Sequence, residues 1–280
     1  MSTDRAVFHH GGRTGFLLIH GLSGTPVELR YIANGLARAG HTVSCPQLAG
    51  HCGSVEDLRD SHWQDWYGSV DKALAELKPH CDKIIVGGLS MGAVMSLYTA
   101  SQHPKDVDGV VLYSPTLWLD GWAVPWYARL FDTVFRKSVA NRIQFSECAP
   151  YGIKDQRLRA IIIDSLHSGD PSKAGFLSIP GGPMLELRWL VNQVRSKLSM
   201  IRQPALIIHP RNDDRASLRN ALYLEKNLAG RVNTVVLDDS YHVITLDHQR
   251  DLVLERTKSF ANSVFENLNS PQNHLSLAVA

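Results

Sequence analysis

Length, composition and charge limit the classes of protein to which this chain can belong. Its 280 residues, 44% hydrophobic and 20% charged, have the composition of a folded globular protein rather than a disordered or collagen-like one. The 29 Lys and Arg residues nearly balance the 27 Asp and Glu residues, and no stretch holds five like charges. Because a nucleic-acid site needs a basic stripe, we expect no nucleic-acid partner and a substrate without strong charge.

Hydrophobic runs and cysteines bear on the compartment. No run approaches the roughly 18 apolar residues of a membrane span, and the N-terminal residues lack the pattern of a signal peptide. The four cysteines show no paired spacing, which favours free thiols over disulfides or a zinc site: Cys45, Cys52, Cys81 and Cys148. We therefore expect a cytoplasmic protein without metal or cofactor.

Short apolar runs alternate with helical patterns in the first 113 residues. Four runs bounded by Gly, Pro or Ser predict buried strands at Phe16–Ile19, His41–Cys45, Lys83–Gly87 and Val110–Tyr113. The segments between them predict helices from Thr25 to Ala39, from Ser61 to about Lys78 and from Gly92 to Ser101. Thr25 and Glu28 have the spacing of a capping box at the start of the first helix. This alternation predicts a mostly parallel sheet with helices on both faces.

The alternation stops between Pro115 and about Gln203, where there is no clean strand and many aromatic residues. It resumes with a strand, a helix, a strand and a helix at Ala205–His209, Ser217–Ala229, Asn233–Leu237 and Gln249–Phe265. We therefore predict an α/β core from residues 1–114 and 204–268, a helical cap insertion over 115–203 and a flexible tail over 269–280.

A nucleophile motif follows the third predicted strand. Gly88-Leu89-Ser90-Met91-Gly92 has the G-x-S-x-G pattern, in which a strand turns sharply into a helix and presents the serine above the sheet edge. The flanking glycines keep side chains out of the crowded corner. Ser90 is therefore the predicted nucleophile.

A serine nucleophile needs a base and an orienting carboxylate, in the chain order Ser, Asp or Glu, His. Asp213 and Asp214 follow the strand Ala205–His209, and His242 follows the next strand. The ends of parallel strands meet at one sheet edge, so these groups are expected to converge on Ser90. We favour Asp213 over Asp214 as the acid, and we interpret His209 as a core histidine.

Two backbone N–H groups are expected to bind the developing oxyanion. One is that of Met91, which follows the nucleophile. The other is that of Leu22, in the loop His20-Gly21-Leu22-Ser23-Gly24 after the first strand, where glycines let the backbone approach Ser90. His20 is expected to support this loop by hydrogen bonding.

These motifs resemble a known family. The sequence His20–Pro26, Gly50-His51, the Ser90 motif, Arg211-Asn212-Asp213 and His242–Asp247 together resemble the small bacterial carboxylesterases and monoacylglycerol lipases of the α/β-hydrolase superfamily. The resemblance implies an α/β-hydrolase fold, a Ser90–Asp213–His242 triad and cofactor-free hydrolysis of carboxylic esters. The chain departs from the family by having Cys52 where Gly-His-Gly is usual, and by a longer insertion after Pro115.

The insertion is expected to cover the nucleophile as a cap. We take Trp122 and Trp126 as candidate substrate-binding residues of an acyl pocket, although packing of the cap onto the core would equally explain them. A third interpretation is an amphipathic helix over Trp122–Phe131 that contacts a lipid surface.

The sequence thus predicts a serine carboxylester hydrolase for short- to medium-chain acyl esters, acting through an acyl-enzyme on Ser90. The alternatives are a monoacylglycerol lipase, a thioesterase, C–C hydrolase or acyltransferase with the same triad, and a ligand-binding receptor on the same fold. The sequence does not specify the oligomeric state.

Overall fold

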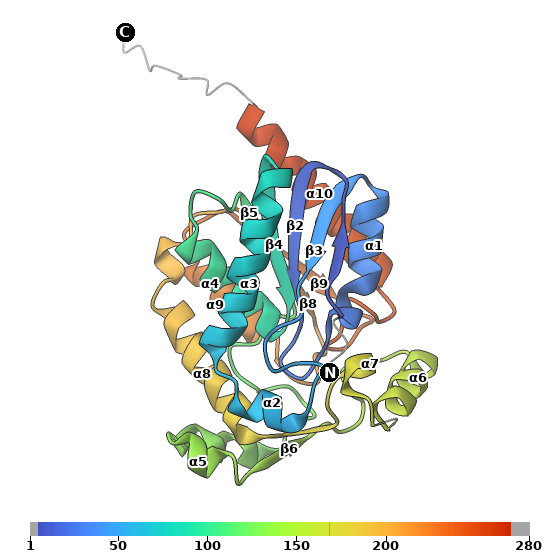
Figure 1. The fold of residues 1–280 in the computed structure, drawn as a ribbon, viewed down its shortest axis with the longest axis vertical. Helices are drawn as coiled ribbons and strands as arrows, with labels where there is room; N and C mark the ends of the chain where they lie inside the picture. The colour runs from blue at the N-terminus through green and yellow to red at the C-terminus, as the bar shows by residue number, and fades with distance from the viewer. Residues whose placement is uncertain (1–4, 168, 270–280) are drawn as a thin grey trace.

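A seven-stranded sheet forms the centre of the molecule (Figure 1). The computed structural model describes residues 5–167 and 169–269. The strand order is β1-β3-β2-β4-β5-β8-β9, and every neighbouring pair is parallel except β1 and β3. The strands are β1 (Val7–His9), β2 (Gly12–Ile19), β3 (His41–Cys45), β4 (Lys83–Leu89), β5 (Gly109–Tyr113), β8 (Ala205–Pro210) and β9 (Val232–Leu237).

Helices cover both faces of the sheet (Figure 1). One face is covered by α1 (Arg30–Arg38) and α10 (Arg250–Asn269), whose apolar side chains share a buried cluster with Phe16 and Val111. The other face is covered by α3 (Trp63–Leu77), α4 (Met91–Gln102), α8 (Gly181–Arg195) and α9 (Arg219–Asn227), which form a second cluster with Leu17 and Val110. Neighbouring residues of β2 and of β5 thus point to opposite faces, as the pleat of a strand requires.

The prediction of an α/β-hydrolase fold is confirmed, and all six predicted strands and the helices between them are present. The sequence did not predict β1 or the short helix α2 (Val55–Asp60). The first predicted helix begins as a 3₁₀ turn, η1 (Pro26–Leu29), and two other 3₁₀ turns follow α3 and α8: η2 (Lys78–His80) and η4 (Leu198–Met200). None of the helices built from the described residues has the length and apolar character needed to cross a bilayer.

The segment between β5 and β8 has two parts. The first part holds η3 (Trp126–Thr133), α5 (Lys137–Ala140), β6 (Gln144–Ser146), α6 (Gln156–His167), α7 (Pro171–Ala174) and β7 (Ser178–Pro180). The strands β6 and β7 pair in an antiparallel two-stranded sheet. This part therefore differs from the helical insertion that the sequence predicted. The second part, α8, buries Leu190 and Val194 in the cluster with α3 and α4 and so flanks the central sheet.

We therefore propose that the cap proper spans residues 115–180 and that α8 belongs to the core, although both fall within the range 115–203 expected for the cap. Of the tail expected over 269–280, residues 270–280 lie outside the described part of the chain.

Candidate active site

Ser90 occupies a sharp turn between β4 and α4. Its φ of +58° lies in the left-handed region that residues with a Cβ rarely adopt, and its N–H donates to the Tyr113 carbonyl at 2.9 Å. Such strained backbone persists at functional sites because the surrounding structure holds it in place. The turn puts the serine at the N-terminus of α4, where the helix dipole favours negative charge.

The two glycines of the motif are required by close backbone contacts. A Cβ on Gly92 would lie 2.0 Å from the carbonyl oxygen of Ile19, and one on Gly88 would lie 2.5 Å from the same oxygen. Both contacts are with backbone, which cannot move aside as a flexible side chain can. The G-x-S-x-G pattern therefore reflects the packing of α4 directly against the end of β2.

Asp213 and His242 form a buried pair in the loops after β8 and β9. The Nδ1 of His242 lies 2.8 Å from Oδ2 and 3.0 Å from Oδ1 of Asp213. Asp213 also accepts the backbone N–H groups of Arg215 at 2.8 Å and Ala216 at 2.9 Å. The carboxylate is thus held in one orientation, and its bond fixes His242 with Nδ1 protonated and Nε2 free to accept a proton.

The electrostatics of the pair suit a general base. Burial favours the neutral forms of both groups, but the charge of each partner outweighs it, so the pKa of Asp213 is lowered and the pKa of His242 is raised. Asp213 is therefore held ionised beside His242, an arrangement that would stabilise an imidazolium if His242 took a proton.

Asp214 and His209, the other candidates at these strand ends, make different contacts. Asp214 accepts backbone N–H groups of Gly152 at 3.0 Å and His242 at 3.2 Å, so it holds the loops and does not contact the imidazole nitrogens. His209 is fully buried, and its Nε2 donates to the Ala216 carbonyl at 2.8 Å. Burial lowers the pKa of His209, which fits the expected core role.

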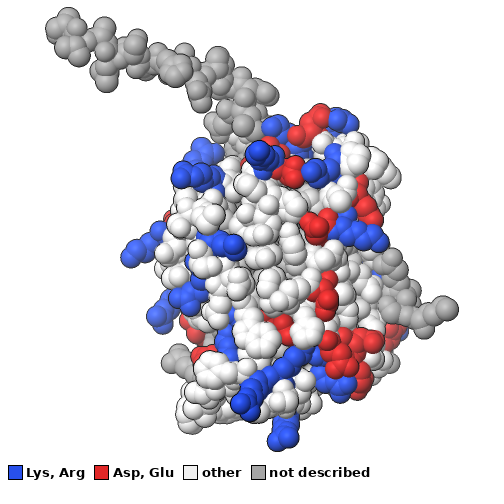
Figure 2. All heavy atoms as spheres, turned by 60° about the vertical axis from the view of Figure 1, so that its left-hand side comes forward, with Lys and Arg blue, Asp and Glu red and all other residues white. Residues whose placement is uncertain are grey.

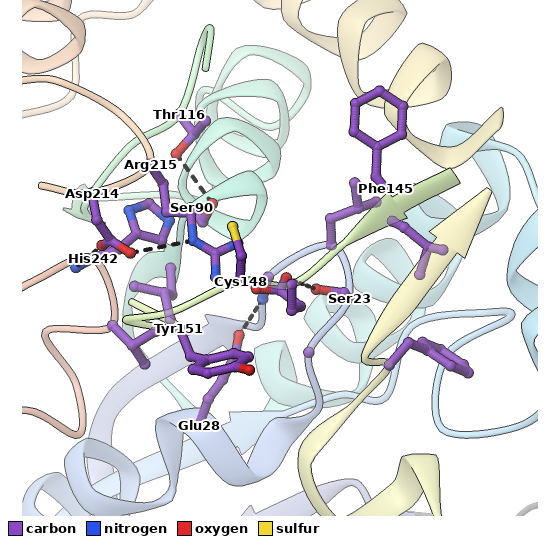
Figure 3. A pocket seen from close by; sticks show the side chains of 18 of the residues that line it. Ser23, Glu28, Ser90, Thr116, Phe145, Cys148, Tyr151, Asp214, Arg215 and His242 are labelled. Carbon is purple, nitrogen blue, oxygen red and sulfur yellow. Dashed lines mark hydrogen bonds and ion pairs between the residues drawn. The ribbon is translucent and has the colours of Figure 1, made fainter. Parts of the chain in front are cut away.

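Ser90 and His242 line the same cavity, and their side chains lie close together in Figure 3. The Ser90 hydroxyl hydrogen-bonds to Thr116 Oγ1 at 3.1 Å. Catalytic hydrogen bonds are often long or differently paired before substrate binds, so this geometry is compatible with a nucleophile–base pair. The structure therefore gathers Ser90, Asp213 and His242 at one sheet edge, as the strand-end argument requires.

Several buried hydrogen-bond contacts from histidine side chains hold the loop after β2. His20 accepts the Leu48 N–H on Nε2 at 3.2 Å, and its Nδ1 contacts the Gly21 carbonyl at 2.9 Å. His51 contacts the Leu22 carbonyl at 2.6 Å through Nε2. Burial lowers the pKa of His20 to about 3 and of His51 to about 4, so both imidazoles stay neutral.

Leu22 and Met91 offer the N–H groups expected for the oxyanion. Within the described residues Leu22 N–H has no hydrogen-bond acceptor, although the loop around it is well bonded. Met91 is the first residue of α4, so its N–H has no acceptor inside the helix. Both therefore remain available to a ligand beside Ser90.

The cavity over Ser90 has a volume of about 280 Å³. Figure 3 shows its polar side chains gathered around Ser90, with Phe145 on the far side. The apolar wall is supplied largely by the cap and α8: Leu119, Val124, Ala128, Phe145, Ile162, Leu166, Phe176, Ile179, Met184 and Leu187. An apolar chamber with a few convergent polar groups is typical of a site for a small organic ligand.

The expectation that Trp122 and Trp126 line the pocket is wrong. Their side chains are 59% and 79% exposed, and neither is among the residues that form the cavity wall. Trp122 instead donates from Nε1 to the Asn212 carbonyl at 3.1 Å and packs edge-on against Tyr241. Their smaller neighbours Val124 and Ala128 line the cavity instead, while both indole rings face outward.

Several polar residues of the cavity were not predicted. Glu147 and Arg215 form an ion pair in the wall, and Ser23 Oγ donates to Glu147 at 3.3 Å. Burial alone would raise the pKa of Glu147, but the Arg215 charge outweighs it and lowers that pKa. These residues are distant in sequence, and Glu147 and Arg215 match no motif, so only the fold brings them together. For His51 the motif Gly50-His51 was a signal, but it indicated no role.

Cys52 has φ of +63°, the left-handed backbone that favours glycine. A glycine here, as in the Gly-His-Gly pattern of the family that the sequence resembles, would adopt this backbone at no steric cost.

Comparison with known proteins identifies the family. The model of a protein family described as the alpha/beta hydrolase fold matches residues 15–249 of this chain. The chain belongs to the α/β-hydrolase family. It is 31% identical over 261 residues to a thermostable monoacylglycerol lipase of Bacillus sp. strain H-257, covering 93% of this chain and 95% of that protein. It is 26% identical to a carboxylesterase of Bacillus subtilis strain 168, covering 92% and 96% of the two chains.

A solved structure has the same fold as this α/β hydrolase. A structure from work on the metagenome-derived lipolytic enzymes LipS and LipT superposes with a TM-score of 0.76 and 26% identity, covering 92% of this chain and 97% of that one. These relatives confirm the resemblance found in the sequence and identify an enzyme of the lipase and esterase type.

The two carboxylates after β8 are expected to differ in their effect on His242. Asp213→Asn removes the charge that raises the imidazole pKa, so the acid limb of the kcat/KM–pH profile should move to lower pH, and kcat should fall by about 10⁴-fold because the tautomer is no longer held.

Asp214→Asn is the matched control. It should lower thermal stability, because the Gly152 and His242 N–H groups lose a charged acceptor, and it should shift the acid limb much less than Asp213→Asn. A profile that moves with Asp214→Asn and not with Asp213→Asn would assign the acid to Asp214. The measurements are kcat/KM from pH 5 to 9 and thermal unfolding of each variant.

Proposed function

We propose that this protein hydrolyses carboxylic esters of short- to medium-chain acyl groups through an acyl-enzyme on Ser90. The observation that carries the proposal is the buried Asp213–His242 pair beside a strained serine in an apolar cavity. A triad is recognised by geometry and roles. The Asp213–His242 hydrogen bond and the cavity that Ser90 and His242 both line support these roles.

The reaction follows from the position of each group. His242 takes the proton of Ser90 as its oxygen attacks the ester carbonyl, and Asp213 stabilises the imidazolium. The N–H groups of Leu22 and Met91 bind the oxyanion. The alcohol leaves with a proton from His242, and a water molecule, deprotonated by the same histidine, releases the acid.

The size of the cavity supports the acyl range. Pockets for small molecules have volumes of roughly 300–1,000 Å³, and the cavity volume of about 280 Å³ lies just below this range. The apolar wall around Phe145, Ile162 and Leu166 suits a hydrocarbon chain, which gains about 0.8 kcal/mol for each CH₂ group removed from water. A chain that outgrows this wall loses that gain, so turnover should peak below long-chain esters.

A second candidate is hydrolysis of monoacylglycerols. Ser23, Glu147 and Arg215 place hydrogen-bonding groups in the wall, where an alcohol with free hydroxyl groups would find partners. The 31% identical relative, a monoacylglycerol lipase, supports the same substrate class. The two candidates differ in the alcohol that the site prefers and in the acyl length at which turnover is greatest.

Hydrolysis of p-nitrophenyl esters from acetate to palmitate tests the proposal. The wild type should show maximal kcat/KM at short or medium chains, and Ser90→Ala should lower kcat by at least about 10⁴-fold because the triad acts as a unit. Competition by 1-monoacylglycerols of matched length would report the preferred alcohol.

The outcomes separate the candidates. A peak at long chains or a strong preference for glycerol esters would favour the monoacylglycerol lipase. Near-normal turnover by Ser90→Ala would contradict the mechanism, and thermal unfolding of that variant serves as the control for its fold.

We further propose that the cap contacts lipid surfaces. Residues 126–143 contain Trp126, Tyr127, Leu130 and Phe135, each at least 59% exposed, and they lie next to the pocket-lining residue Ala128. The same stretch has four basic residues and one acidic residue in its sequence, which favours anionic lipid. In Figure 2 the cap end, at the bottom, presents uncharged surface together with Lys and Arg side chains.

Vesicle binding tests this contact. Replacing Trp126 and Phe135 together with Ala should weaken co-sedimentation with anionic phosphatidylglycerol vesicles by about tenfold or more, because two aromatic rings no longer enter the interface. Hydrolysis of water-soluble p-nitrophenyl butyrate should be unchanged.

Replacing Met200 and Leu222 with Ala is the matched control, since both are exposed apolar residues outside the cap. Equal loss of vesicle binding in the two double variants, or none in either, would contradict the proposal.

A further inference from the structure

The carboxyl group of Glu28 lies under the loop that carries Leu22. The Thr25–Glu28 spacing predicted a capping box, in which the carboxyl would accept the Thr25 N–H. Neither bond of that motif forms: Thr25 Oγ1 accepts the Val27 N–H at 3.2 Å instead of the Glu28 N–H, and the Glu28 carboxyl accepts the Gly21 N–H (Figure 3). The acidic residue thus bonds to the loop and not to the helix start.

The loop is shaped around this carboxyl group. A Cβ on Gly24 would lie 2.1 Å from Glu28 Oε2, and one on Gly21 would lie 3.1 Å from Oε1. Both glycines therefore leave space that the carboxyl fills. Glu28 also lines the same cavity as Ser90 and His242, so it lies within the site although no step of the reaction uses it.

The hydrogen bond from the Gly21 N–H to Glu28 adds to the contacts that hold the peptide group between Gly21 and Leu22. The Gly21 carbonyl contacts His20 Nδ1 at 2.9 Å and the Gly24 N–H at 3.3 Å, and the Leu22 carbonyl contacts His51. With Glu28 on the Gly21 N–H, three of the four backbone polar groups of Gly21 and Leu22 are occupied. The fourth is the Leu22 N–H, which has no acceptor among the described residues.

We propose that Glu28 is a positioning residue that fixes the direction of the Leu22 N–H toward the oxyanion. Glycine has the widest range of backbone angles, so Gly21 without its acceptor would let the following peptide rotate. An oxyanion donor is effective only when it is aimed in advance at the developing charge. This inference rests on the proposed ester hydrolysis.

The protonation state of Glu28 determines which substitutions are informative. Burial raises the pKa of its carboxyl to about 7, against the opposing effects of the Gly21 hydrogen bond and the His242 charge. Near neutral pH a protonated carboxyl still has a carbonyl oxygen that can accept the Gly21 N–H. Gln keeps this oxygen at the same distance along the side chain, whereas Met keeps the volume and offers no oxygen acceptor.

The test compares Glu28→Met and Glu28→Gln in kcat, in KM and in affinity for a trifluoromethyl ketone, which forms an oxyanion on the nucleophilic serine. Glu28→Met should lower kcat by about 10- to 100-fold, below the 10²–10³-fold loss of a whole oxyanion donor, with KM within about threefold. Its affinity for the ketone should fall by the same factor as kcat. Glu28→Gln should stay within about threefold of the wild type in all three quantities.

Asp57→Asn is the matched control. Asp57 is another carboxylate at the third position of a helix, it accepts the Ser54 N–H at 2.8 Å, and it is not part of the cavity wall. This variant should lose some thermal stability and keep its kcat. Thermal unfolding identifies any variant that does not fold, and Glu28→Ala then takes the place of Glu28→Met.

Three results would overturn the inference: a folded Glu28→Met variant with kcat within twofold of the wild type, an effect on KM alone, or equal losses for Met and Gln. These three results bear on the role of Glu28 only if the wild type hydrolyses esters. A wild type without esterase activity would instead contradict the proposed function.

Discussion

The close approach of helix α4 to strand β2 determines the geometry of the site. At Gly92 the two backbones are so near that a single Cβ would lie 2.0 Å from the Ile19 carbonyl oxygen. The approach forces β4 to turn abruptly into α4, which puts Ser90 in its strained conformation. It also sets the loop that continues from β2 beside the nucleophile. Nucleophile and oxyanion loop are therefore positioned by one packing contact.

Backbone hydrogen bonds join the cap to the loops that carry the proposed catalytic residues. Gly121 and Ala123 donate their N–H groups to the carbonyls of Arg215 at 2.9 Å and Asp214 at 3.1 Å. Val243 N–H donates to the Gly152 carbonyl at 2.8 Å, and Phe176 N–H donates to that of Ser23 at 3.0 Å. Each of the three loops that carry Asp213, His242 and Leu22 has a backbone hydrogen-bond partner in the cap. The cap thus supports these loops as well as supplying the apolar wall.

Much of the core could be predicted because its signals are local. The glycines around Ser90 reflect a contact that any chain with this turn must satisfy, and the positions of Asp213 and His242 follow from the meeting of parallel strand ends. The cap could not be predicted in this way. The sequence shows that Trp122 and Trp126 are aromatic, but their orientation depends on how the cap folds, and both rings face outward.

Contacts between distant residues were equally inaccessible from the sequence. Glu147 and Arg215 form an ion pair in the cavity wall, and neither lies in a recognisable motif. Glu28 shows a further limit, because its spacing from Thr25 fits a capping box but its carboxyl accepts the Gly21 N–H of the loop after β2. Local spacing identifies the acceptor, and only the folded loop determines which donor it meets.

Ser90 is proposed as the nucleophile that His242 activates. Mass spectrometry after reaction with a fluorophosphonate tests this assignment, since the reagent labels serines that are activated by a base. We expect one adduct per chain, located on the peptide that contains Ser90, absent in Ser90→Ala and formed far more slowly in a folded His242→Ala variant. An adduct on another residue, or equal labelling rates with and without His242, would contradict it.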